Sequence, residues 1–144
     1  MGSEPATDWT LDPQLEHDTI FVCDLPLCQV RLMNDANYPW LLLVPRRAKA
    51  SEITDLSEAD QAQLMREVAQ SVRALKSETV CLKINVAAIG NIVAQLHVHV
   101  VARFRNDPAW PKPVWGHLPA RAYEDTARQN LVAAMRTRLT IAPA

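Results

Sequence analysis

The sequence lacks an excess of either charge and any long hydrophobic run, and both absences restrict what the protein can bind. Its 144 residues include 15 basic and 16 acidic side chains, for a formal net charge of -1. Proteins that bind duplex nucleic acid carry an excess of basic residues, so duplex nucleic acid is not an expected partner. The longest apolar runs are far too short to span a bilayer, so a membrane is not an expected partner either.

Cysteine is scarce and unpaired. Cys23, Cys28 and Cys81 form an odd set with no Cys-x-x-Cys spacing. They lie in apolar, strand-like segments, where buried structural thiols are expected. The N-terminus has neither the basic region nor the apolar region of a signal peptide. Together these features predict a reduced protein of the cytoplasm.

The length and an apolar fraction of 49% are typical of one globular domain. Such a chain buries roughly two thirds of its unfolded surface without needing a metal or a disulfide. Residues 1–12 are polar and are expected to form a flexible tail. Residues 13–144 are expected to form a single domain, with a segment rich in proline and tryptophan at residues 106–119 and then a C-terminal helix.

The apolar periodicity predicts the element order β-β-β-α-β-β-α. Alternating or β-branched segments bounded by turn residues are typical of strands, and Ser57 followed by acidic residues is typical of a helix N-terminus. Short turns between strands, with the helices on one side, predict an α+β fold around an antiparallel sheet of about five strands. The expected strands are residues 19–23, 28–33, 40–44, 80–86 and 95–101, and the expected helices are a long one at residues 57–76 and a C-terminal one carrying Tyr123, Ala127, Leu131 and Met135.

The most informative stretch is Gln95-Leu96-His97-Val98-His99-Val100-Val101, which contains half of the histidines. Side chains of a strand alternate between its two faces. Gln95, His97 and His99 are therefore expected to project to one side, while the apolar residues between them project into the interior. A polar face of this kind within a buried strand predicts a functional site. Satisfied strand histidines without chemistry are the structural alternative.

Two imidazoles on one rigid face suit chemistry at phosphorus. A neutral imidazole is a good nucleophile near pH 7, and its second nitrogen can be held by an acceptor. One histidine would attack phosphorus while its neighbour donates a hydrogen bond to a leaving or bridging oxygen. This arrangement predicts phosphoryl or nucleotidyl transfer that requires no metal or other cofactor.

The histidine stretch resembles the motif of the histidine triad (HIT) superfamily, His-φ-His-φ-His-φ-φ, where φ is apolar. The resemblance includes the Gly90-Asn91 turn before it and the strand and helix order of roughly residues 17–105, and it is closest to bacterial HIT-like proteins. It implies a HIT-like fold, with the long helix and the C-terminal helix packed on the sheet. It also implies that His97 forms a covalent nucleotidyl intermediate at an α-phosphate and that His99 supports it.

The sequence departs from the family pattern at two positions. Gln95 stands where the first histidine is expected, and an amide can donate and accept hydrogen bonds but cannot carry a proton, so catalysis is expected to be slowed or retuned. Ile92 stands where many relatives have a serine or threonine that touches the phosphate. Asn91 keeps an amide where relatives often have glutamine, and Asn85 matches the polar residue that ends the preceding strand. Turn formation is the alternative explanation for both asparagines.

Further candidates for nucleotide binding are Asn34, in the turn before the central strand, and Arg103, two positions beyond Val101 on the histidine face. Turn formation explains Asn34 equally, and charged residues at strand ends are usually solvated. Trp110 and Trp115 are unusual for a loop. They are expected to cover the pocket, to contact a second subunit, or to pack onto their own domain.

The resemblance implies a nucleotide hydrolase or nucleotidyl transferase that acts on an adenosine phosphoramidate or a dinucleoside polyphosphate, and it implies a homodimer. An alternative is a catalytically weak or inactive nucleotide-binding or signalling module on the same fold. A third hypothesis is a metal enzyme that uses His97 and His99 as ligands, but such a site needs a further ligand and usually lies in an all-β chain.

Overall fold

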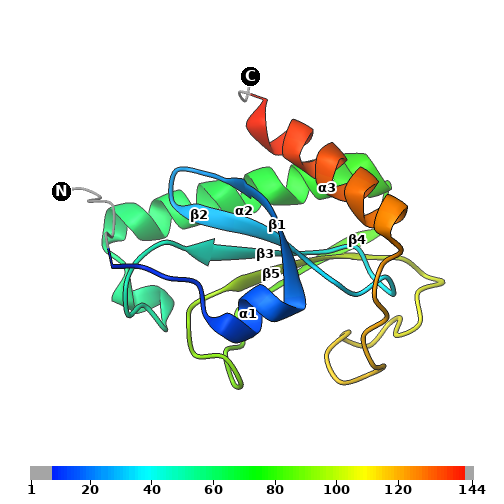
Figure 1. Ribbon diagram of the computed structural model, residues 1–144, viewed down its shortest axis with the longest axis horizontal. Coiled ribbons are helices and arrows are strands. Elements are labelled where there is room, and N and C mark those ends of the chain that lie inside the picture. The colour runs from blue at the N-terminus through cyan, green and yellow to red at the C-terminus, as the bar shows by residue number, and fades with distance from the viewer. Residues whose placement is uncertain (1–7, 142–144) are drawn as a thin grey trace.

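The computed structural model describes residues 8–141. They form an antiparallel sheet of five strands with helices on both faces (Figure 1). The strand order is β1-β2-β3-β5-β4, counting strands along the chain, so the predicted α+β architecture is confirmed. No helix in residues 8–141 is long and apolar enough to cross a membrane. The elements are α1 (Pro13–Asp18), β1 (Thr19–Asp24), β2 (Cys28–Met33), β3 (Trp40–Pro45), the 3-10 turn η1 (Ile53–Asp55), α2 (Glu58–Thr79), β4 (Lys83–Ala87), β5 (Val98–Arg103) and α3 (Asp125–Thr140).

The central strand β3 is buried along its whole length, as its continuous apolar run predicts. It lies between β2 and β5 and pairs with both in antiparallel register. Successive side chains of β3 pack into two different hydrophobic cores, one on each face of the sheet. Leu41 and Leu43 pack with α2 and α3, whereas Trp40 and Leu42 pack on the opposite face with residues of α1 and of the segment after β5. This second face carries the histidine pair.

The long helix α2 begins as predicted. The Ser57 hydroxyl accepts a hydrogen bond from the backbone N–H of Asp60, and Glu58 and Asp60 lie in the first turn, where negative charge is favourable. The helix runs to Thr79, and Val80 ends it in a left-handed conformation with φ of 53°. The predicted strand at residues 80–86 therefore starts too early, because Val80 ends the helix and β4 begins at Lys83.

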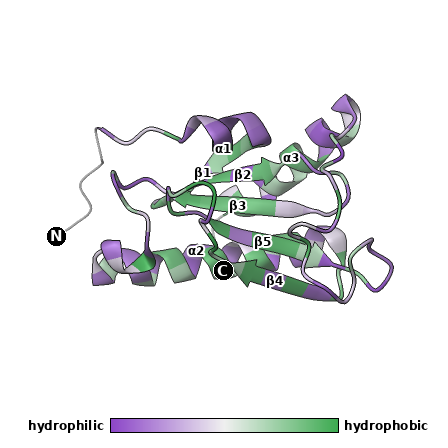
Figure 2. Ribbon diagram, turned by 90° about the horizontal axis from the view of Figure 1, so that it is seen from below, coloured by the Kyte–Doolittle hydropathy of each residue, from purple (hydrophilic) through white to green (hydrophobic). Residues whose placement is uncertain are grey.

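The sequence-based order omits α1, which lies against the face opposite α2 and α3 (Figure 2). The Asp12 carboxylate accepts a hydrogen bond from the backbone N–H of Gln14, and Pro13 occupies the first turn, a combination typical of a helix start. Six residues are too few to show an apolar periodicity. The expectation that helices lie on one side of the sheet is corrected accordingly. Residues 1–7 of the predicted tail lie outside the described residues.

The buried carboxylate of Glu67 joins α2 to the turn between β1 and β2. Its two oxygens accept hydrogen bonds from the backbone N–H groups of Leu27 and Cys28, each at 2.8 Å, and Gln63 donates to the same carboxylate at 2.7 Å. Burial, reinforced by Glu67, raises the pKa of the Cys28 thiol, and burial raises that of Cys23 to about 11. Both thiols are buried and free, as expected of structural cysteines.

Replacement of Glu67 by alanine is expected to lower the free energy of unfolding by about 3 kcal/mol, because two buried backbone donors lose a charged acceptor. Glu67→Gln should cost about half as much, since its amide keeps one acceptor oxygen. Urea unfolding measures both changes. Met65→Ala, at an exposed position of the same helix, is the control and should change stability by less than about 0.5 kcal/mol. Equal stabilities for Glu67→Ala and Met65→Ala would contradict this account of the hairpin.

Candidate active site

His97 and His99 lie side by side on the sheet face opposite α2 and α3. Their ring centroids are 4.9 Å apart, and both residues are more than nine-tenths buried. Leu96, Val98 and Val100 project into the core under the two long helices, so the predicted alternation of faces is observed. The regular strand begins only at Val98, because the backbone N–H of Leu96 donates to Ala50 instead of a neighbouring strand.

The hydrogen bond made by His97 fixes its tautomer. Its Nδ1 lies 2.7 Å from the backbone carbonyl oxygen of Gln95. A carbonyl oxygen can only accept, so Nδ1 carries the hydrogen. In the neutral ring the lone pair is then on Nε2. This nitrogen is the one that the predicted attack on phosphorus would use.

His99 is held in the opposite tautomer. The indole N–H of Trp40 donates to His99 Nδ1 at 3.0 Å, and an indole nitrogen can only donate. The hydrogen of the neutral ring is therefore on Nε2. Burial, reinforced by the neighbouring His97, lowers the pKa of His99 to about 4, so the ring is neutral at pH 7.

The two rings therefore present complementary atoms, a lone pair on His97 and an N–H on His99. A phosphate group at this position would meet a nucleophile and a hydrogen-bond donor at once. The ring of Trp115 packs against His99 and Trp40 edge to face, at centroid distances of 5.2 and 5.8 Å. Of the three roles considered for Trp115, the structure shows two, because the ring packs onto its own domain and also borders the cavity in front of the histidines.

A cavity of about 440 Å³ opens in front of both rings, within the roughly 300–1,000 Å³ of typical small-molecule sites. Its walls are mainly apolar, and its polar groups lie at the histidines, at Asn91 and at α1. Asn91 and Ile92 border it as the sequence suggested, and Ile92 exposes 95% of its surface. The lining residues that the sequence analysis did not single out are Gln14, Leu15, Asp18, Met33, Leu42, Ile89 and Val93. Those of α1 were missed because the helix itself was missed.

Gln95 acts on the site in a way that the motif does not reveal. Its side-chain oxygen accepts from the backbone N–H of Asp12 at 2.8 Å, and its amide nitrogen donates to the carbonyl oxygen of Thr10 at 2.8 Å. The side chain thus secures the segment before α1, while the backbone carbonyl holds His97. The main chain of Gln95, and not its side chain, therefore orients the imidazole of His97.

Asn85 and Arg103 lie together but apart from the cavity lining. Arg103 is almost fully buried and donates to Asn85 at 2.7 Å, to both carboxylate oxygens of Asp107, and to the carbonyl oxygen of Lys112. Its guanidinium also lies 5.5 Å from the ring of Trp110. These contacts organise the proline- and tryptophan-rich segment, so a structural role accounts for Asn85, Arg103 and Trp110.

Asn34 is likewise engaged with the protein. Its side-chain oxygen accepts from the backbone N–H of Tyr123 at 3.0 Å. Its backbone N–H donates to the backbone carbonyl oxygen of Asp18. It does not border the cavity. The turn interpretation therefore accounts for its position.

The hypothesis of a metal enzyme needs a third ligand beside the two histidines. In residues 8–141, no group of three or more His, Cys, Asp or Glu side chains is arranged to hold a metal ion. The Nδ1 atoms of both rings are also occupied by protein partners. The available atom of each ring is Nε2.

Comparison with known proteins supports the similarity suggested by the motif. The HIT domain family model matches residues 14–106. A histidine triad protein from Bradyrhizobium japonicum is 53% identical, with 91% of this chain and 98% of that chain covered and a TM-score of 0.90. One from Sinorhizobium meliloti is 46% identical, with 92% and 98% covered and a TM-score of 0.89.

A curated relative, an AP-4-A phosphorylase from Mycobacterium tuberculosis, is 30% identical over 116 residues. The aligned region is 74% of this chain but only 58% of that protein, so the chain spans less than two thirds of the length of this relative. The family match includes the whole sheet and both histidines. The chain therefore belongs to the HIT family.

Proposed function

We propose that this protein is a cytoplasmic nucleotide hydrolase or nucleotidyl transferase that acts at the α-phosphate of a nucleotide conjugate through a nucleotidyl intermediate on His97. The observation that carries the proposal is the pair of opposite tautomers, His97 with a free Nε2 and His99 with an Nε2–H. Structural histidines need no such complementarity. The adjoining cavity has apolar walls suited to a nucleoside.

The proposed reaction has two steps and uses no metal ion. His97 Nε2 attacks the α-phosphorus, the bond from phosphorus to the leaving group breaks, and the leaving group departs with the electron pair. His99 donates its Nε2–H to a phosphoryl oxygen throughout. Water then attacks phosphorus, the bond to His97 breaks, and a nucleoside monophosphate and a proton are released.

The relatives support the class of substrate. An AP-4-A phosphorylase acts, by its name, on a nucleotide conjugate, and it shares 30% of its residues with this chain over the aligned region. The dinucleoside polyphosphate is a candidate substrate on this basis, and the adenosine phosphoramidate is one on the basis of the motif resemblance.

A binding module without turnover is the second candidate function. The observation that favours it is Gln95, whose side chain is directed to the backbone of residues 10–12 and supplies no proton to the site. In that case nucleotides would bind in the cavity and remain intact.

Protein quenched during reaction with adenosine phosphoramidate or diadenosine tetraphosphate is expected to carry an adenylyl adduct on His97. Intact-mass spectrometry and peptide mapping detect it. His97→Ala should abolish the adduct and reduce kcat by at least about a thousandfold, because no other group replaces the nucleophile. His117→Ala, outside the site, is the control. Nucleotide binding without an adduct or released monophosphate would favour the binding module.

Trp40→Phe is expected to raise the pKa of His99 by about one unit, because it removes the indole donor that opposes protonation of Nδ1. Histidine NMR titration gives the pKa directly. Trp115→Phe keeps a ring against His99 and alters no hydrogen bond to it, so it should leave this pKa unchanged. Equal pKa values in Trp40→Phe and the parent would contradict the assigned tautomer.

We also propose that the protein is a homodimer joined along β4. This strand is at the edge of the sheet and carries exposed apolar residues, with Leu82 before it and Val86 within it each 49% exposed and Val80 83% exposed. Exposed apolar edge strands favour pairing with another chain.

Val86→Lys is expected to convert the dimer to a monomer, because charge on an edge strand opposes strand pairing. Sedimentation equilibrium measures the mass. Met65→Lys, at an exposed position of α2, is the matched control and should remain dimeric. A monomeric parent protein would refute the proposed dimer.

A further inference from the structure

The side-chain amide of Gln95 binds the backbone on both sides of Leu11. Its oxygen accepts a hydrogen bond from the N–H of Asp12, and its nitrogen donates to the carbonyl oxygen of Thr10, each at 2.8 Å. An amide presents its C=O and one N–H along the same edge, whereas the two nitrogens of an imidazole point in divergent directions. A histidine at this position would therefore make only one of the two hydrogen bonds.

The segment that Gln95 binds leads directly into α1, because Asp12 is the residue that caps this helix. A helix of six residues is too short to be stable in isolation, so its position depends on what holds its two ends. The C-terminal end is fixed by the chain itself, since β1 begins at Thr19. The N-terminal end is held by the two hydrogen bonds to Gln95 and by the packing of Trp9 and Leu11 on the core of the histidine face.

Helix α1 forms part of the wall of the cavity of about 440 Å³ in front of the histidines, to which it contributes Gln14, Leu15 and Asp18. The Gln14 amide donates to both carboxylate oxygens of Asp18, each at 3.0 Å, so the two polar side chains of this wall are held together. With phosphorus against His97, the space that remains for the nucleoside includes the space beside α1. The position of α1 therefore determines the shape of the nucleoside site.

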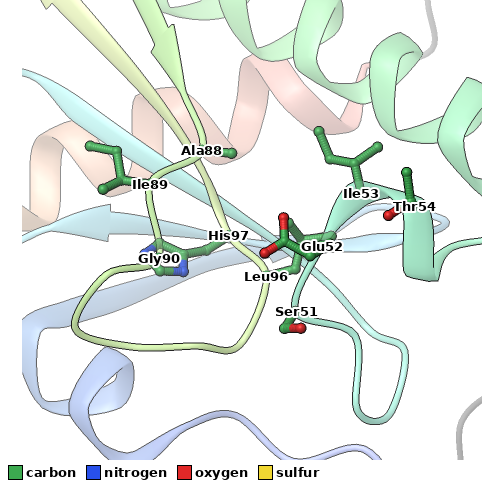
Figure 3. A pocket seen from close by; sticks show the side chains of 9 residues that line it. All are labelled: Ser51, Glu52, Ile53, Thr54, Ala88, Ile89, Gly90, Leu96 and His97. Atoms are coloured by element: carbon green, nitrogen blue, oxygen red, sulfur yellow. The ribbon is translucent and has the colours of Figure 1, made fainter.

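The position of His97 does not depend on the side chain of Gln95. The Nδ1 of His97 binds the backbone carbonyl oxygen of Gln95, which any residue at that position supplies. The backbone N–H of Leu96 donates to the carbonyl oxygen of Ala50 at 2.9 Å. Leu96 and His97 also lie with residues 51–54 around a smaller cavity of about 210 Å³, behind the histidine segment (Figure 3). A change in the side chain of Gln95 should therefore leave the nucleophile in place.

We propose that Gln95 is a positioning residue for nucleotide binding, which holds α1 in place as a wall of the nucleoside site. This inference rests on the proposed function. Glutamine at this position supplies an anchor with two hydrogen bonds to the segment before α1, and a histidine does not. A histidine restored at this position would therefore weaken nucleotide binding and would not increase the rate of the chemical step.

Gln95→His and Gln95→Leu are both expected to weaken the binding of adenosine 5′-monophosphate by about fivefold, the contribution of one net hydrogen bond. Isothermal titration calorimetry measures this affinity. KM for diadenosine tetraphosphate should rise by a similar factor, whereas kcat should change by less than about twofold, because the backbone contact to His97 is kept. Hydrogen exchange of residues 9–18 should become faster in both variants, and bound adenosine 5′-monophosphate should slow it.

Gln70→Leu is the matched control. The Gln70 amide also links two distant segments, since it donates to the carbonyl oxygen of Leu139 at 2.9 Å, but Gln70 does not border the cavity in front of the histidines. Its replacement should leave the nucleotide affinity and the exchange of residues 9–18 unchanged. Unchanged affinity in Gln95→Leu, or a raised kcat in Gln95→His, would overturn the role of Gln95 while leaving the proposed function intact. A parent protein that neither binds adenosine 5′-monophosphate nor forms an adduct on His97 would overturn the proposed function, and this inference with it.

Discussion

The antiparallel pairing of β3 with β5 is the constraint on which the core and the site both depend. The register places Leu42 opposite His99 and Trp40 opposite Val101. Trp40 and His99 are therefore diagonal neighbours on one face, within reach of a large side chain. Because β3 is buried on both faces, a shift of one residue would send Trp40 into the wrong core. The core that stabilises the fold therefore also fixes the hydrogen bond from Trp40, which determines the tautomer of His99.

The site works through fixed hydrogen-bond partners rather than through many charged groups. A backbone carbonyl holds His97 and an indole holds His99, and neither partner can change its donor or acceptor role. The two imidazoles are consequently preorganised, with one accepting and one donating nitrogen. Asp18 is the carboxylate that borders the cavity, and it lies on α1 at the margin of the site.

Local patterns in the sequence predict much of this fold. The hairpin of β1 and β2, the central strand and the long helix follow from alternation, an apolar run and a capping serine, which act over a few residues. Elements with short or ambiguous signals were missed or misplaced. α1 is too short to show a period, and Val80 has the composition of a strand but ends a helix. Arg103 has the position of a site residue, yet its buried partners give it a structural role.

The sequence by itself determined the family motif, the two histidines and the face on which they lie, because side chains of a strand alternate regardless of context. Only the tertiary structure decided which nitrogen of each histidine is available. That choice depends on Trp40, 59 positions from His99, which reaches it only because two strands pair in one register. The side chain of Gln95 likewise finds its partners 83 and 85 positions away. Contacts over such separations are set by topology and packing, so they leave no local pattern in the chain.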